Sequence, residues 1–71
     1  MEFLFVEFYE NRHLVIDDSL TAWQTNETVL IPGGRHVIAI SLPPDFAPPE
    51  IPVVMENTTV LSPKHVKFSR L

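Results

Sequence analysis

Apolar residues alternate with other residues along most of this chain, so the hydrophobic pattern repeats at every second position. Residues 2–9 place Leu4, Val6 and Phe8 on one side of an extended segment, and residues 35–42 repeat the pattern. A period of two is that of a β-strand, in which successive side chains point to opposite faces. No stretch keeps the helical period of about 3.6 residues for long enough to be stable alone. The sequence therefore predicts an all-β fold with no substantial helix.

Turn-forming residues divide the chain into short strands. Asp17-Asp18-Ser19 and Pro32-Gly33-Gly34 are typical of turns, because short polar side chains bond their own backbone and Gly accepts unusual backbone angles. The expected strands are residues 2–9, 13–17, 28–31, 35–42, 53–56 and a final strand around Val66 and Phe68. We expect Ile38, Ile40 and Leu42 to share the inner face of their strand. Short strands at this spacing predict a small β-sandwich of mainly antiparallel strands.

Two segments are expected to lie outside these strands. Residues 43–52 hold five of the seven prolines. Because Pro cannot donate a backbone hydrogen bond, this Pro-rich loop is predicted to be an extended connection, with Phe46 as its buried anchor. The stretch Thr21–Asn26 is expected to be irregular.

Length and composition exclude several classes of protein. The chain has 71 residues, so residues 1–71 form one domain with one small core. The absence of Cys excludes disulfides, thiolate metal sites and Cys nucleophiles. Nine acidic residues oppose five basic ones, giving a net charge of −4. No nucleic-acid partner is expected, because phosphate contacts need a basic surface.

No targeting or membrane-spanning segment is recognisable. Glu2 and Glu7 bracket only four apolar residues at the N-terminus, whereas a signal peptide needs a longer apolar run after a basic region. No run approaches the roughly 20 apolar residues that span a bilayer. We therefore expect no membrane insertion, and a cytoplasmic location by default.

The histidines and serines lack the spacing of a chemical site. His13, His36 and His65 lie 23 and 29 residues apart, unlike the short ligand spacings of structural zinc sites. No Ser stands in a nucleophile motif. The sequence predicts no catalytic residue, no metal and no cofactor. His36, which follows a turn, is expected to be a partly buried imidazole that donates to a backbone carbonyl.

The aromatic residues leave two questions open. Trp23 is the only Trp, and it either caps the open end of the core or forms a contact surface. Phe3 and Phe5 make the first strand apolar on both faces, so something must cover it. The covering is either another part of the chain or a second copy added strand to strand, and the small size of the domain favours the dimer.

Three segments carry a resemblance to a known family. His13-Leu14-Val15-Ile16-Asp17-Asp18 matches a first strand and turn, Thr25–Leu30 a second part, and Ile31–Ile38 a Pro-Gly-x-His core that is specific only around Pro32–His36. On these segments, residues 12–61 resemble a PEGA-type domain, with Phe46 at the aromatic of the next turn. The literal Pro-Glu-Gly-Ala string is absent, and the strand at 2–9 is additional.

The resemblance implies a non-catalytic β-sandwich module that is often attached to proteins of the cell envelope. Such modules are usually supposed to contact carbohydrate or protein. A carboxypeptidase-regulatory-like sandwich would give a similar pattern and is the nearest alternative family.

These observations predict a non-catalytic interaction or structural module. Its partner is a protein or a second copy of the chain, contacted through an edge strand or an exposed aromatic surface. The alternative is a carbohydrate-binding module in which Trp23 and Tyr9 stack on sugar rings, which requires both to be exposed. The candidate contact residues are Phe3, Phe5, Tyr9, Trp23 and Phe46.

Overall fold

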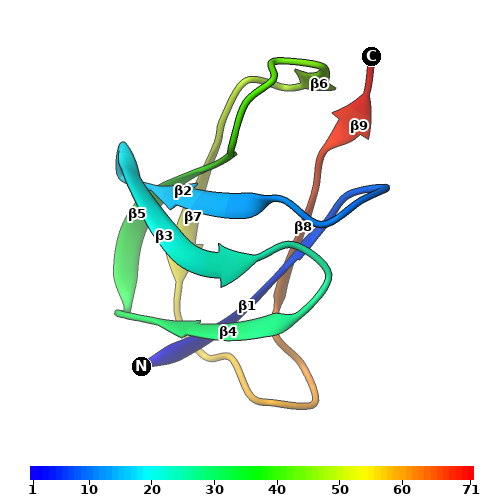
Figure 1. Ribbon diagram of the computed structural model, residues 1–71. Coiled ribbons are helices and arrows are strands. Elements are labelled where there is room, and N and C mark those ends of the chain that lie inside the picture. Colours follow the sequence, from blue (N-terminus) through cyan, green and yellow to red (C-terminus); the bar gives the residue numbers. More distant parts are fainter.

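The computed structural model describes residues 1–71 and consists of strands joined by turns and loops (Figure 1). In chain order the strands are β1 (Glu2–Glu7), β2 (His13–Ile16), β3 (Ser19–Gln24), β4 (Thr28–Ile31), β5 (Gly34–Ile40), β6 (Phe46–Ala47), β7 (Ile51–Met55), β8 (Lys64–Lys67) and β9 (Ser69–Arg70). The predicted all-β class is confirmed. The structure contains no helix that is long and apolar enough to cross a membrane.

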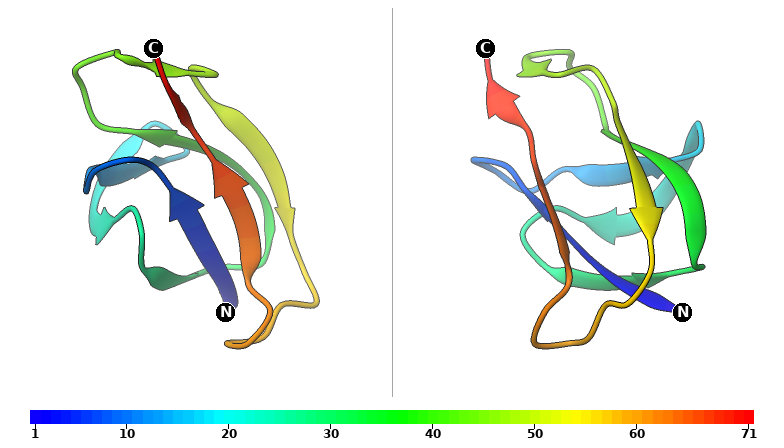
Figure 2. Two further views of the ribbon diagram at one scale, coloured as in Figure 1. Left: turned by 90° about the vertical axis from the view of Figure 1, so that its right-hand side faces the viewer. Right: turned by 180° about the vertical axis from the view of Figure 1, so that it is seen from behind.

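The strands form two main sheets and one small one. Sheet A has three strands in the order β4-β1-β8, sheet B has four in the order β3-β2-β5-β7, and β6 pairs with β9. Every pairing is antiparallel except that of β1 with β8, which is parallel. Figure 2 shows β1 and β8 running side by side, with the strands of sheet B curving around the interior. The arrangement agrees with the predicted mainly antiparallel β-sandwich.

The core lies between sheets A and B and takes the inward side chains of both. Leu4 and Val6 of sheet A and Leu14 and Ile38 of sheet B have no exposed surface. Burying an aliphatic side chain of this size contributes about 1.5–3 kcal/mol. The core consists of Leu4, Val6, Phe8, Leu14, Ile16, Val29, Ile31, Ile38, Ile40, Phe46, Val53, Met55, Val66 and Phe68. The inward side of the first strand is therefore as predicted.

The fifth strand is shorter than expected. It ends at Ile40, and Leu42 is 76% exposed, so the prediction that Leu42 lies inward is wrong. Ser41 still donates its backbone N–H to the carbonyl of His13. Pro43 then has no N–H to offer, and the pairing stops. Leu42 is left outside the core, next to the Pro-rich loop.

The stretch that was expected to be irregular is largely the strand β3, which forms a hairpin with β2. Asp17 and Asp18 have φ angles of 52° and 65°, and two consecutive positive φ values make the tight turn that suits a hairpin. Asp tolerates this backbone region better than most residues. A register shift between the pairs His13–Gln24 and Val15–Leu20 interrupts the hairpin. This shift breaks the alternation of β3, which is why its sequence does not read as a strand.

The Pro-rich loop is partly a strand, and its predicted anchor is confirmed. Phe46 is buried, and it begins β6, which pairs with β9 near the C-terminus. Its ring meets those of Phe8 and Phe68 edge to face, with centroids 6.2 Å and 5.6 Å away. Edge-to-face pairs of this kind stabilise beyond the area they bury. The loop is thereby fixed to both ends of the chain.

The first strand lies in the centre of its sheet. β1 pairs with β4 on one side and with β8 on the other. It therefore has no free edge, and the expected addition of a second copy at this strand is wrong. The covering comes from within the chain. The outward side chains Phe3 and Phe5 stay half-buried on the outside of sheet A.

Arg12, between β1 and β2, holds the start of the Pro-rich loop. Its side chain is 8% exposed. Nη1 donates to the carbonyls of Ser41 and Pro43 at 3.0 and 3.1 Å, and Nη2 donates to both oxygens of Asp45 at 2.9 Å. Nε donates to Glu10. The hydrogen bond from Arg12 is the main reason that the pKa of Asp45 lies below its ordinary value.

Replacing Arg12 is expected to loosen this loop. Arg12→Met removes the guanidinium and with it the bonds to Glu10, Asp45 and the carbonyls of Ser41 and Pro43 that hold the loop. Hydrogen bonds to charged groups contribute about 1.5–3 kcal/mol each. Thermal unfolding followed by circular dichroism should show a clearly lowered Tm. Lys67→Met is the matched control, because Lys67 is 65% exposed and its nearest carboxylate oxygen is 3.7 Å away. Equal Tm values for the two variants would contradict the role of Arg12.

Shortening a core side chain is expected to destabilise the whole sandwich. Leu4 has no exposed surface, and Leu4→Ala should lower the free energy of unfolding by about 2–5 kcal/mol through lost burial and the cavity left behind. Leu20→Ala is the control, since Leu20 is 69% exposed and should change stability little. Urea unfolding of both variants measures the difference, and similar losses would show that the core is placed wrongly.

Candidate functional site

Sheet B carries apolar side chains on its outer surface as well as in the core. In the register of its strands, Val15 lies opposite both Leu20 and Ala39, and Val37 lies opposite Pro52. These side chains alternate with the buried residues of the same strands and so point away from the core. We define the outer face of sheet B as Val15, Leu20, Arg35, Val37, Ala39, Pro52 and Val54.

This composition is unusual for a surface of a small sheet. An antiparallel sheet with one buried side commonly presents polar residues on the other. Here Arg35 is the only charged member of the outer face, and Leu20 and Val54 are 69% and 50% exposed. Contiguous apolar surface of this kind marks sites of interaction more often than isolated apolar residues do.

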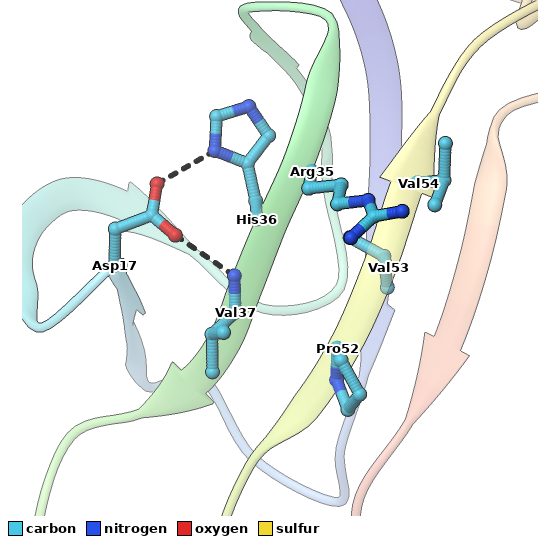
Figure 3. A pocket seen from close by; sticks show the side chains of 7 residues that line it. All are labelled: Asp17, Arg35, His36, Val37, Pro52, Val53 and Val54. Carbon is cyan, nitrogen blue, oxygen red and sulfur yellow. Dashed lines mark hydrogen bonds and ion pairs between the residues drawn. The ribbon is translucent and has the colours of Figure 1, made fainter.

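A hollow of about 390 Å³ lies at the end of the outer face where β5 begins. It is lined by Asp17, Arg35, His36, Val37, Pro52, Val53 and Val54 (Figure 3). In Figure 3, Asp17 and His36 stand on one side of β5, and Arg35, Pro52 and Val54 stand on the side of β7. The hollow is thus apolar in its centre and has charged groups at its borders.

A second, more apolar hollow of about 560 Å³ lies at the opposite end of the same face. Its lining residues are Val15, Leu20, Ala39, Ile40, Ser41, Leu42, Pro44, Phe46 and Pro49. The Pro-rich loop therefore forms one wall of the hollow. Phe46 itself is buried at its base, so the loop offers Leu42 and the prolines to a partner more than the predicted contact residue.

His36 links two turns beside the first hollow. Its Nδ1 lies 2.6 Å from Oδ2 of Asp17, and its Nε2 lies 2.8 Å from the carbonyl oxygen of Pro32. The predicted partly buried imidazole with a backbone carbonyl partner is confirmed, at 12% side-chain exposure. The second partner, Asp17, lies 19 residues away in the chain and was not predicted.

Both partners of His36 can only accept a hydrogen bond, so the doubly protonated imidazolium fits the site best. The hydrogen bond to Asp17 is accordingly the main reason that the pKa of His36 is raised, and the same bond lowers the pKa of Asp17. Asp17 also accepts the backbone N–H of Val37 at 2.8 Å. With both nitrogens engaged, His36 fastens the β2–β3 turn to the β4–β5 turn and is not free to act as a general base.

The other histidines lie elsewhere. His65, on β8, has its Nε2 3.0 Å from Glu7, and its ring meets Phe5 edge to face at 5.3 Å. His13 begins β2 and is exposed. No group of three or more metal-ligating side chains comes together in the structure.

The predicted aromatic contact residues do not form one surface. Phe3 and Phe5 lie on the outside of sheet A, whereas Trp23 lies on β3 of sheet B and is 39% exposed. Tyr9 is 51% exposed, but the guanidinium of Arg70 lies 4.4 Å from its ring centroid and covers one ring face. Stacking of Tyr9 and Trp23 on a common sugar is not favoured by this arrangement.

The outer face of sheet B was missed by the sequence analysis, although the signal was present. Val37 and Ala39 alternate with the inward Ile38 and Ile40, so this strand is apolar on both sides. A strand that is apolar on both sides predicts a second contact surface. Only the pairing of β5 with β2 and β7 shows that Val15 and Pro52 extend that surface.

The chain was compared with known protein families, curated proteins and solved structures. No protein-family model, no curated protein and no solved structure matches the chain. The resemblance to PEGA-type domains therefore stays a prediction.

The Asp17–His36 contact is expected to make stability depend on pH in two directions. The raised pKa of His36 gives a contribution that is complete below its ordinary pKa of 6.5 and is lost as pH rises through the raised value. The lowered pKa of Asp17 gives a contribution that is complete above its ordinary 3.8 and is lost as pH falls through the lowered value. Wild type should therefore exceed His36→Gln in stability mainly between these limits.

Urea unfolding of both proteins over a pH series measures this difference. Asp18→Asn serves as the control, because Asp18 is in the same turn and makes no side-chain hydrogen bond. A stability difference between wild type and His36→Gln that stays constant from acid to alkaline pH would show that the contact carries no charge-dependent stabilisation.

Proposed function

We propose that this protein is a non-catalytic interaction module that binds a protein partner through the outer face of sheet B. The observation that carries the proposal is the apolar surface itself, which has a hollow at each end and the exposed side chains of Leu20 and Val54. Removing such an apolar surface from water lowers the free energy, which favours binding of a partner.

Contact through this face is better supported than addition of a strand at a sheet edge. The backbone N–H and C=O of Val37 both bond to Asp17, on the side of β5 that faces β2. Val37 and its opposite residue Pro52 therefore exchange no hydrogen bonds, and the backbone nitrogen and carbonyl of Pro52 point to the free edge of β7. Pro has no N–H, and Pro on an edge strand blocks pairing. The edge strand β8 carries Lys64 and Lys67, which oppose pairing through their charge.

The remaining edges are also poor templates. The register shift in β3 disturbs the row of hydrogen-bonding groups that a new strand would need. β4 has only four residues, and short edge strands pair weakly. The partner is therefore expected to lie on the face of sheet B. The resemblance of residues 12–61 to non-catalytic PEGA-type modules supports the same class of function.

Affinity capture from a lysate of the native host tests this function. Tagged wild type is compared with a Leu20→Glu/Val54→Glu variant, which places two carboxylates on the outer face at exposed positions. We expect wild type to retain a specific protein, identified by mass spectrometry, and the variant to lose it. The cause is the cost of burying an unpaired charge in the interface.

Leu30→Glu is the matched control. Leu30 is an exposed apolar residue at 41%, but it lies on sheet A, opposite Phe3. Circular dichroism must first show that all variants are folded. Loss of the captured protein with the control as well as with the double variant would place the binding surface elsewhere. Binding of a glycan that depends on Trp23 would instead favour the carbohydrate-binding alternative.

A further inference from the structure

We propose that the partner of the outer face of sheet B is a second copy of this chain, packed face to face about a two-fold axis. This proposal rests on the proposed function and names its partner. The observations that carry it are the charge of Arg35 on this face and the opposite charge of Glu50 just beyond the far end of β7, neither of which has a partner within the chain.

Arg35 and Glu50 are these two charges. Both are exposed, and neither belongs to any ion pair or side-chain hydrogen bond in the structure. The other bases near sheet B are engaged, since Arg12 bonds to Asp45 and His36 to Asp17. Arg35 is thus the free base on this face, and Glu50 is the free carboxylate beyond its opposite end.

The strand register explains why the two charges do not meet within one chain. Arg35 lies opposite Val54, at the end of the face where β5 begins. Glu50 directly precedes β7 and continues the outward alternation of Val54 and Pro52. Glu50 lies four positions before Val54, which corresponds to about 13 Å along a strand. The two charges therefore mark opposite ends of the face.

A two-fold axis that lies between the faces and runs across the strands exchanges these ends. In such a pair the Arg35 end of one copy faces the Glu50 end of the other, and the symmetry forms the contact twice. Facing sheets pack about 10 Å apart, a gap that a long Arg and a Glu side chain span together. An arrangement in which like ends face each other does not bring Arg35 and Glu50 together.

The same two-fold axis also brings the hollow at each end of one face over the opposite end of the other face. The hollow beside Arg35 comes to lie over the end where Leu42 is 76% exposed, and the hollow beside the Pro-rich loop comes to lie over the end where Val54 is 50% exposed. Each hollow therefore faces an end of the other copy that carries an exposed apolar side chain. Filling the hollows in this way removes apolar surface from water on both sides.

The size of the face limits the affinity. Four strands spaced by about 4.8 Å, along a β5 of seven residues, give a flat area of roughly 400–450 Å² before side chains are counted. Stable interfaces bury about 800 Å² per partner. The dimer should accordingly be weak, with a Kd on the order of micromolar or above. Asp18 and Glu56 add free carboxylates near the face and weaken it further at low salt.

Charge reversal and its restoration test the proposal. Sedimentation equilibrium of wild type, from micromolar to about millimolar concentration, should show a monomer–dimer equilibrium. Arg35→Glu and Glu50→Arg should each weaken dimerisation at least about tenfold, because each places like charges in contact. The double variant R35E/E50R restores opposite charges and should recover most of the wild-type affinity.

Lys64→Glu is the control, since Lys64 is an exposed base without an ion pair on sheet A. It should leave the Kd unchanged. A wild type that stays monomeric at millimolar concentration overturns the dimer, while the capture experiment still decides the proposed function. Single variants that dissociate without recovery in the double variant overturn the pairing of Arg35 with Glu50. A dimer that survives Leu20→Glu/Val54→Glu overturns the assignment to this face.

Discussion

The hydrogen bonds of Arg12 hold together parts of this protein that the sheets alone do not connect. Arg12 stands between β1 and β2 in the chain, and its guanidinium bonds to the backbone after β5 and to Asp45. Phe46 follows directly and enters the core. One buried cation thus fixes the Pro-rich loop, and the loop in turn forms a wall of the larger hollow on sheet B. A charge buried to this extent is stable only because every donor has an acceptor.

The proposed contact surface is a face of a sheet because the edges of the sheets are protected against pairing and the outer face of sheet B is not. Pro52, the lysines of β8 and the register shift in β3 each hinder the addition of another strand. The face of sheet B has no comparable protection. On β5 its outward residues after Arg35, which are Val37 and Ala39, are apolar. A module of this size has little core to spare, and burying a second apolar face against a partner adds to its stability.

The sequence predicted features that depend on one strand or turn alone. It did not predict features that depend on contact between two segments distant in the chain. The alternation around Leu4 and Ile38 predicted which residues are buried, and the turn residues predicted most strand limits. The hairpin strand β3 was missed, because its shifted register removes the alternation. The bonding of His36 to a turn carbonyl was predicted from its position after a turn, whereas its partner Asp17 lies 19 residues away. The candidate aromatic residues were recognised individually, but nothing local shows that they lie on different sheets.

The sequence by itself determined the class of fold and the inner side of each regular strand, because side-chain alternation and backbone preferences act between near neighbours. Tertiary structure alone decided that β1 lies inside its sheet and that Arg12 meets Asp45. It also decided that Val15, Val37 and Pro52 form one surface. These arrangements depend on pairings between segments distant in the chain. Such pairings are selected by the packing of the whole core, which no local pattern records.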